Sequence, residues 1–228
     1  MVAGTAVSAR ELILGRVRAA LVDVPGDEPP AWEPSQDRDD AARYNRHSEL
    51  ERAAIVALFA QRCGEYRASI THAGRGTGGV RGAIEAACAR HRVGSLVAPA
   101  DLPEGWRPGG VAVALDEPAL ANRRLDRVDG ALTGCALAIA ETGTIVLDTG
   151  AVQGRRALTL LPDLHICIVR AEQIVASVPE AFELLAASVR ESARPLTLIS
   201  GPSATSDIEL KRVEGVHGPR RLEVVIVP

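Results

Sequence analysis

The sequence of 228 residues is nearly free of lysine: Lys211 is the single lysine among its 26 lysine and arginine residues. A Walker-type phosphate loop and a Schiff-base mechanism both require a lysine, and no glycine-rich Lys-Ser/Thr signature surrounds Lys211. These two classes of site are therefore excluded. Long apolar runs are also absent, since no stretch approaches the ~18 residues that span a bilayer. With no basic segment followed by an apolar run at the N-terminus, we expect a cytoplasmic protein without a membrane partner.

The sequence also lacks the spacings that hold metals. Its four cysteines are scattered among apolar or small residues and form no C-x-x-C pair. Zinc sites and iron–sulfur clusters need such pairs, and a catalytic zinc site is often marked by H-E-x-x-H, which is missing here too. We therefore expect no cofactor, no metal and four reduced, mostly buried cysteines. These are Cys63, Cys88, Cys135 and Cys167.

A concentrated positive charge is the third absence. The chain carries 26 basic and 29 acidic residues, its net charge is −3, and the two signs are interspersed along the sequence. A surface that binds nucleic acid or an acidic membrane needs a concentrated basic face. The charge pattern therefore predicts no nucleic-acid partner.

The N-terminal part of the chain is predicted to be a helical arm. A capping box of Ser8 and Glu11 begins the first helix, and a second helix is expected from Ser48 to Cys63. Between them, residues 23–40 are acidic, rich in proline and almost without apolar side chains, which is typical of a linker. We therefore divide the chain into an arm, 1–64, and an α/β domain, 65–228.

Strand and helix patterns alternate through the rest of the chain. This alternation predicts a mainly parallel sheet with helices on both faces. Expected strands are 66–72, 95–99, 110–115, 164–170, 196–199 and 222–227, and expected helices are 80–92, 117–127, 153–161 and 178–191.

Two apolar runs within Ala131–Asp148 flank the tripeptide Glu141-Thr142-Gly143. This arrangement indicates adjacent strands, such as a hairpin inserted in the parallel order. A partly buried glutamate at such a turn has a raised pKa and is suited to act as a base or nucleophile. Thr142 supplies a hydroxyl and Gly143 permits close approach of a ligand. The alternative is a glutamate that only faces solvent.

A second candidate site follows the expected strand that ends near Ile199. Residues 201–207, beginning Gly201-Pro202-Ser203 and ending at Asp207, form a turn of small residues, and Ser206 with Glu209 matches a capping box. Exposed backbone amides at such a helix start favour an anion. The alternative is a plain turn whose hydroxyl groups cap their own helix.

Further candidates are basic residues and glycines. Arg155 and Arg156 are placed to clamp a phosphate or carboxylate, although surface arginines are abundant in this chain. His165 shares one strand face with Cys167 and is either a core histidine or a ligand-binding one. On the turn His217-Gly218, the imidazole is within reach of the 201–207 loop or has a structural role. Residues 74–79 resemble a phosphate turn but lack the G-x-G-x-x-G spacing.

Three segments together resemble the lactate-utilization (LUD) domain family. They are Thr133–Asp148, Gly154–Val169 and Ile199–Val227, and the resemblance extends from about Tyr66 to the C-terminus. It implies an α/β fold like that of NagB, ribose-5-phosphate isomerase and CoA transferases. It also implies a role in a complex that oxidises L-lactate to pyruvate, in which a partner subunit carries the iron–sulfur clusters.

The same resemblance implies a set of site residues. One departure is Ala204, where relatives carry a larger polar residue, which removes a side-chain hydrogen bond at that position. The positions carried over are Glu141, Thr142, Gly143, His165, Gly201, Pro202, Ser203, Asp207, Glu209, His217 and Gly218.

Three functions are compatible with these residues. The first is a non-redox subunit of the lactate-oxidising complex, which binds a small carboxylate, a phosphorylated ligand or the iron–sulfur partner proteins. The second is a CoA-transferase-like or acyl-transfer enzyme in which Glu141 is the nucleophile and Ser203 helps to stabilise an oxyanion. The third is a regulatory or scaffold protein with a vestigial pocket.

Overall fold

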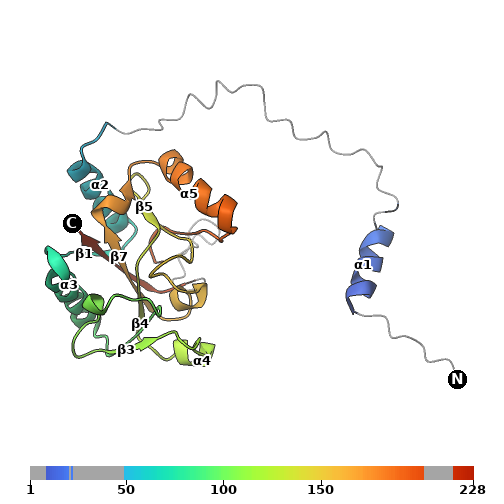
Figure 1. Cartoon of the computed structure of the whole chain (residues 1–228), viewed down its shortest axis with the longest axis horizontal. Helices are drawn as coiled ribbons and strands as arrows, with labels where there is room; N and C mark the ends of the chain where they lie inside the picture. Colours follow the sequence, from blue (N-terminus) through green and yellow to red (C-terminus); the bar gives the residue numbers. More distant parts are fainter. Residues whose placement is uncertain (1–8, 21, 23–48, 203–217) are drawn as a thin grey trace. The chain divides into compact units, whose positions relative to one another are not determined.

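The computed structural model describes residues 9–20, 22, 49–202 and 218–228, which fall in two compact units, Met1–Arg43 and Tyr44–Pro228. The first unit contains helix α1 (Ala9–Ala20; Figure 1). All side chains of this helix are exposed, including those of Leu12, Ile13 and Val17. Ser8 and the expected linker 23–40 lie outside the described residues. The rest of the fold belongs to the second unit.

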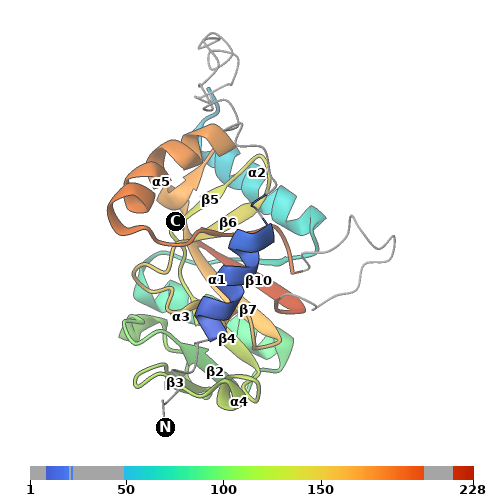
Figure 2. The same ribbon diagram turned by 90° about the vertical axis from the view of Figure 1, so that its right-hand side faces the viewer.

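Six parallel strands form the main sheet of the second unit, in the order β1-β10-β7-β4-β2-β3 (Figures 1 and 2). The mainly parallel α/β fold predicted from the alternating patterns is thereby confirmed. The strands are β1 (Ser69–His72), β2 (Ser95–Ala98), β3 (Ala112–Leu115), β4 (Gly130–Thr133), β7 (Leu164–Arg170) and β10 (Arg221–Val227).

Helix α3 (Gly76–His91) covers one face of the main sheet. Its buried side chains, such as Val80 and Ile84, pack against alternate residues of the strands, among them Leu96 and Ile166. Successive side chains of a strand point to opposite faces, so the intervening residues face away from α3. The strands β7 and β10 are therefore apolar on both faces, as a sheet covered on both sides requires.

Helix α2 (Arg52–Glu65) covers part of the opposite face. Ile55, Phe59 and Cys63 recur at a spacing of four residues, which places them on one side of the helix, and all three are buried in the core. The sequence analysis assigns this helix to the N-terminal arm, whereas its apolar side is part of the core of the second unit. The domain boundary at residue 64 stays a prediction.

A second sheet covers the remainder of that face, with the strand order β8-β5-β6-β9. Its strands are β5 (Leu137–Ile139), β6 (Thr144–Leu147), β8 (Ile174–Val175) and β9 (Thr197–Ile199). The expected hairpin is present as the antiparallel pair β5–β6, and β9 pairs with β6 in an antiparallel manner. The expectation that the hairpin and residues 196–199 join the parallel sheet is therefore wrong.

The chain leaves the main sheet at Gly134, between β4 and β5. There the Gly134 amide donates to the Val152 carbonyl (2.7 Å) instead of extending the parallel ladder. Helix α5 (Val178–Ser192) packs on the second sheet through Ala181 and Leu185 (Figure 2). Pro179 lies in its first turn as expected, and Ser177 caps it by accepting from the Glu180 amide (3.4 Å).

Several expected helices are short turns in the structure. The segment expected as a helix from 117 to 127 contains only α4 (Asn122–Leu125), because the Asp116 carboxylate accepts from the Leu120 amide (2.7 Å) and stabilises a turn before it. The segment 153–161 contains only the 3₁₀ turn η3 (Arg156–Thr159). Two further 3₁₀ turns are η2 (Glu104–Trp106) and η4 (Ala171–Gln173).

Candidate functional site

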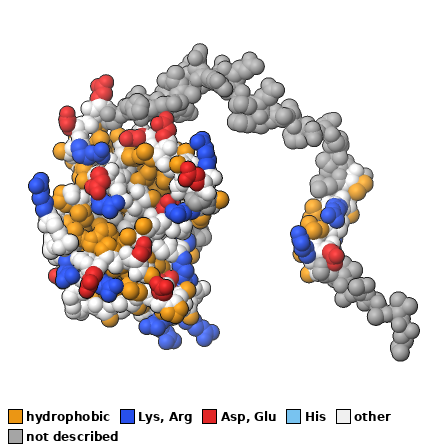
Figure 3. Space-filling model, in the orientation of Figure 1, with side chains coloured by type: hydrophobic (Ala, Val, Ile, Leu, Met, Phe, Trp, Pro, Cys, Tyr) orange, Lys and Arg blue, Asp and Glu red, His pale blue; other side chains and the backbone are white. Residues whose placement is uncertain are grey.

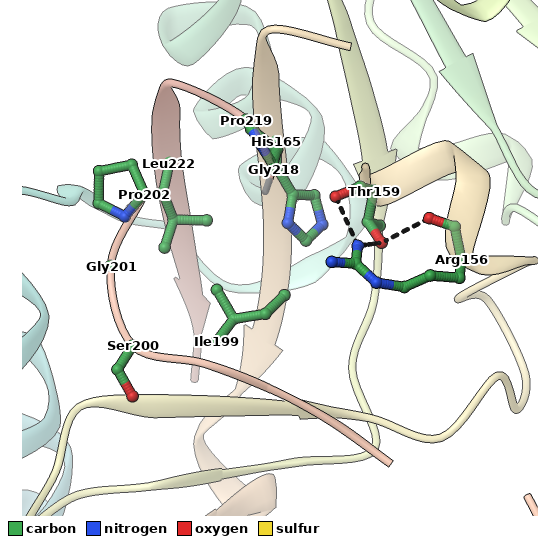
Figure 4. Close-up of a pocket in the computed structure, with 10 residues that line it drawn as sticks. All are labelled: Arg156, Thr159, His165, Ile199, Ser200, Gly201, Pro202, Gly218, Pro219 and Leu222. Atoms are coloured by element: carbon green, nitrogen blue, oxygen red, sulfur yellow. Dashed lines mark hydrogen bonds between the residues drawn. The ribbon is translucent and has the colours of Figure 1, made fainter. Parts of the chain in front are cut away.

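A small cavity of about 70 Å³ lies between the two sheets (Figure 4). Its walls come from the face of β7 and β10, the end of β9, the turn η3 and the residues on either side of segment 203–217. The cavity therefore lies over the face of the main sheet, against strands β7 and β10. Its lining residues are Arg156, Thr159, His165, Ile199, Ser200, Gly201, Pro202, Gly218, Pro219 and Leu222.

His165 and Thr159 are the buried polar residues among those that line this cavity. His165 lies on β7 between Ala131 and Leu222 of the neighbouring strands, and its side chain is completely buried. One ring nitrogen, Nε2, lies 2.8 Å from the hydroxyl of Thr133. The other, Nδ1, has no hydrogen-bond partner among the described residues. Burial, and to a smaller extent the positive charge of Arg156, lowers the pKa of His165 to about 4. The ring is therefore neutral at physiological pH.

Arg156 supplies a positive charge to the same cavity. Its Nη1 donates to the carbonyl and the hydroxyl of Thr159 (2.8 and 2.9 Å), which fixes the guanidinium on η3. Its guanidinium and the imidazole of His165 face the same space (Figure 4). Burial lowers the pKa of Arg156, but an arginine keeps its charge at any physiological pH. The cavity therefore combines a fixed cation with a neutral imidazole.

A chain of hydroxyl groups connects the cavity with the hairpin turn. The Thr142 and Thr144 hydroxyls lie 2.7 Å apart, and the Thr144 hydroxyl lies 2.7 Å from that of Ser200. Ser200 lines the cavity, whereas Thr142 does not. The Glu-Thr-Gly turn therefore supports the cavity wall through side-chain hydrogen bonds.

The structure brings five of the sequence-predicted site residues into this cavity: Arg156, His165, Gly201, Pro202 and Gly218. Four predicted residues do not line it, namely Glu141, Thr142, Gly143 and Arg155. The remaining four lie outside the described residues, namely Ser203, Asp207, Glu209 and His217, as does Ser206 of the expected capping box. The ligand-binding roles assigned to all of these residues stay predictions.

Arg155 and Arg156 are adjacent in sequence but have separate roles. Arg155 binds Asp116 through two hydrogen bonds, from Nε (2.7 Å) and Nη2 (3.1 Å), and also donates to the Leu120 carbonyl. The hydrogen bonds from Arg155 are the main cause that holds the pKa of Asp116 below its ordinary value. Arg155 therefore stabilises the loop that precedes α4, and only its neighbour is directed into the cavity.

Glu141 is exposed at the turn between β5 and β6. Its Oε1 accepts a hydrogen bond from the amide of Val178 (2.9 Å), the first residue of α5. A carboxylate at this position satisfies a free amide and lies at the positive end of the helix dipole. The contact accounts for a glutamate at this turn by its effect on α5.

Gly143 and Gly201 are required by the close approach of α2. Both have left-handed backbone angles, with φ of +59° and +80°. A Cβ on Gly143 would lie 2.8 Å from the backbone of Arg62, and one on Gly201 would lie 2.7 Å from Tyr66. Other residues are strained in this conformation and would also collide with the helix. The glycine at position 143 is therefore explained by the close approach of α2, and its predicted role beside a ligand stays a prediction.

Five lining residues were not found from the sequence. Ser200 and Pro219 are direct neighbours of predicted residues, so proximity in sequence was an available signal. Ile199 and Leu222 lie in predicted strands and have the ordinary pattern of core residues. No sequence pattern marks Thr159 as a site residue, because its role as the acceptor for Arg156 depends on the 3₁₀ turn η3.

The secondary candidate at residues 74–79 forms the junction between β1 and α3. None of these residues lines the cavity. In the part of the chain that the structure describes, no group of three or more His, Cys, Asp or Glu side chains is arranged to hold a metal ion. None of the described helices combines the length and apolarity that a bilayer crossing requires. Charged side chains of both signs are scattered over the visible face of the molecule (Figure 3).

Comparison with known families agrees with this arrangement. The family model described as "LUD domain" matches residues 111–227. The chain belongs to the LUD domain family. The LUD match extends from β3 to β10 and so includes every residue that lines the cavity, whereas α2, β1, α3 and β2 precede it.

Similar proteins place the LUD domain of this chain among bacterial relatives. A protein named lactate utilization protein C from Deinococcus radiodurans is 54% identical over 178 residues, which cover 78% of this chain and 82% of that protein. The protein of the same name from Geobacillus kaustophilus is 29% identical, covering 64% and 68%. A crystal structure of a DUF162 family protein from D. radiodurans matches with a TM-score of 0.68 at 49% identity, covering 78% of this chain and 99% of that one.

Proposed function

We propose that this chain serves lactate utilization as a subunit without its own redox centre, and that it binds a small carboxylate in the cavity between the two sheets. The name of its relatives, lactate utilization protein C, supports the cellular process. The geometry of the cavity supports the chemical class of the ligand.

The observation that carries the proposal is Nδ1 of His165, which has no partner among the described residues and belongs to a ring that lines the cavity beside the cation of Arg156. Buried polar atoms in proteins are nearly always hydrogen-bonded, so an unpaired one on a residue that lines a cavity indicates a missing partner. A guanidinium fixed by Thr159 is suited to bind the planar oxygens of a carboxylate. The imidazole of His165 and the guanidinium of Arg156 are therefore suited to bind a polar, negatively charged ligand.

Apart from the hydroxyls of Thr159 and Ser200, the remaining side chains that line the cavity are apolar. Pro202 and Leu222 lie on the side opposite Arg156, and Ile199 lies between them and the guanidinium (Figure 4). A short aliphatic group fits against such a surface, whereas a second charged group would lose its hydration there. A small carboxylate with one apolar end matches both sides of the cavity.

Isothermal titration calorimetry of the full chain with L-lactate tests the binding site. We expect the wild-type chain to bind L-lactate. The variant Arg156→Gln should lower the affinity at least about tenfold, because a charge-assisted hydrogen bond contributes about 1.5–3 kcal/mol. Arg155→Gln is the matched control, because its side chain is bound to Asp116 outside the cavity, and we expect it to leave the affinity unchanged. Equal losses in both variants, or no binding of lactate or of related carboxylates, would contradict the proposal.

The second part of the proposal is that partner proteins carry the iron–sulfur clusters. Two observations support it. The resemblance to the LUD family implies a lactate-oxidising complex, and this chain has no C-x-x-C spacing with which to bind a cluster itself. A tagged chain purified from lactate-grown cells of its source organism is expected to bring iron-containing proteins with it. If the chain elutes alone and a deletion strain oxidises lactate at the normal rate, this part of the proposal is wrong.

No contact favours the acyl-transfer alternative over this function. Glu141 does not line the cavity, and its carboxylate accepts from the first amide of α5. The role of Glu141 as a nucleophile stays a prediction. A scaffold function would be indicated by a chain that binds its partners but none of the carboxylates in the titration.

A further inference from the structure

The hydrogen bonds of Thr133 determine which nitrogen of His165 carries the proton. The Thr133 hydroxyl donates its single hydrogen to the carbonyl of Gly134 (2.9 Å). With that donation made, the hydroxyl accepts from His165, and we assign the ring proton to Nε2, at 2.8 Å. In the neutral ring, Nδ1 then carries a lone pair and no hydrogen.

This lone pair is a buried acceptor on a residue that lines the cavity. His165 is completely buried, and its Nδ1 has no partner in the part of the chain that is described. The neighbouring Arg156 has only donors, and its Nη1 is committed to Thr159. A ligand that satisfies both groups needs an acceptor with negative charge for Arg156 and, close to it, a hydrogen-bond donor for His165.

We propose that the cavity selects a small 2-hydroxy acid over the corresponding 2-oxo acid, with the carboxylate on Arg156 and the hydroxyl donating to Nδ1 of His165. This inference rests on the proposed function, because it names the class of carboxylate that the cavity binds. A 2-oxo acid presents only acceptors, so its keto oxygen would face the lone pair of Nδ1 without a hydrogen between them.

The size of the cavity limits the third substituent of the acid. A water molecule needs roughly 10–15 Å³ of such space, so a cavity of about 70 Å³ holds roughly five to seven atoms of that size. Ile199 and Leu222 provide the apolar contact for a methyl group. The three-carbon hydroxy acid, lactate, satisfies the charge, the donor and the volume together.

Calorimetry with three acids of similar size tests the selection. The full chain is titrated with L-lactate, pyruvate and propionate at pH 7.5 and constant ionic strength. All three carry a carboxylate, but only lactate carries a hydroxyl donor. A buried acceptor left unpaired loses its hydration without a replacement, so we expect lactate to bind at least about tenfold more tightly than the other two.

Two variants of His165 test the residue assigned to this selection. His165→Gln keeps an amide that reaches Thr133 but has no acceptor at the Nδ1 position, so the preference for lactate should disappear while weak carboxylate binding persists. His165→Asn has an amide group near the Nδ1 position, and we expect it to retain part of the preference. Thermal unfolding of both variants establishes that they are folded.

The outcomes separate this inference from the proposed function. Equal affinities of the wild-type chain for all three acids would overturn the selection and leave carboxylate binding intact. Failure of all three acids to bind would overturn both. A preference for lactate that survives in His165→Gln would contradict the role of His165.

Discussion

Two buried polar residues on neighbouring strands differ in how completely they are paired. Glu223 of β10 and His165 of β7 are both fully inaccessible to solvent and lie on opposite faces of the main sheet. The carboxylate of Glu223 accepts from Arg90 (2.7 and 2.8 Å) and from the hydroxyl of Thr71 (2.6 Å), and lies 2.8 Å from Nε2 of His91. Within the described part of the chain, His165 has a partner for only one of its two nitrogens.

The difference separates a structural site from a binding site. Burial of a polar group is unfavourable unless its hydrogen bonds are made within the protein. At Glu223 they are all supplied by α3 and β1, so this residue holds the helix and the edge strand together. At His165 one is missing among the described residues, and the ring lines a cavity, which under our proposal receives a ligand that supplies this bond. We therefore expect changes at Glu223 to affect stability and changes at His165 to affect binding.

The largest expected effect on stability is that of Glu223→Gln. The neutral amide removes the negative charge opposite Arg90 and His91, and its NH₂ group meets donors instead of acceptors. We expect the free energy of unfolding in urea to fall by about 3 kcal/mol, since Arg90 is half-exposed and recovers some hydration. The affinity for L-lactate should not change.

Glu172→Gln is the matched control for this variant. Glu172 pairs with Arg170 (3.1 Å), but both side chains are exposed, and such surface pairs contribute little. We expect no measurable loss of stability. Equal unfolding curves for Glu223→Gln and Glu172→Gln would show that the buried cluster is no more important than a surface pair.

The second prediction concerns the pH dependence of stability. The pKa of His165 is about 4 in the folded chain and about 6.5 when unfolded. As the pH falls below about 6.5, the unfolded state binds the proton first, so the native state loses stability down to pH 4. The loss from this residue is on the order of 3 kcal/mol. Urea unfolding between pH 7 and 4.5 measures it.

His165→Gln provides the comparison, because glutamine does not titrate. The difference in stability between wild type and variant should shrink or reverse as the pH falls through this window. If the two chains keep a constant difference from pH 7 to 4.5, then His165 is not held neutral by burial. The contrast with Glu223 would then lose its electrostatic basis.

A smaller effect is expected for Asp116→Asn, which tests a polar pair that is complete but only partly buried. The asparagine keeps one acceptor for Arg155 and loses the charge. Because about a third of the Arg155 side chain is exposed, we expect a loss of about 1 kcal/mol in urea unfolding. Carboxylate binding should stay normal. A large loss of affinity instead would mean that Arg155 and Arg156 act together on the ligand.

The sequence predicted the main sheet well, because its strands are apolar on both faces and are separated by helices. It did not predict which strands leave that sheet. The run from Ala131 to Ile139 has the composition of one buried strand, and its division at Gly134 depends on a hydrogen bond to Val152, which is distant in sequence. Similarly, α2 has an apolar side, but only the folded chain shows that Phe59 fills the core.

At the candidate site, the sequence indicated which side chains could bind a ligand, but not which groups contact those side chains in the folded chain. Arg156 and His165 are both sequence-based candidates. The sequence does not show which of Arg155 and Arg156 enters the cavity, because they are identical residues at consecutive positions. The bond from Arg155 to Asp116 joins positions 39 residues apart. Likewise, the sequence predicts close approach of a ligand at Gly143, whereas the packing of α2 against this glycine is visible only in the folded chain.

The smallest expected effect concerns Glu141, the residue whose sequence context most favoured catalysis. Its contact with the Val178 amide makes it a complete polar group, like Glu223, but at an exposed position. Glu141→Gln keeps an acceptor for that amide and loses only the charge at the start of α5, so we expect a loss of about 0.5 kcal/mol in urea unfolding. Growth on lactate should be normal in a strain that carries this variant. If growth fails while stability is unchanged, the carboxylate reacts, and the hairpin turn rather than the cavity is the centre of the chemistry.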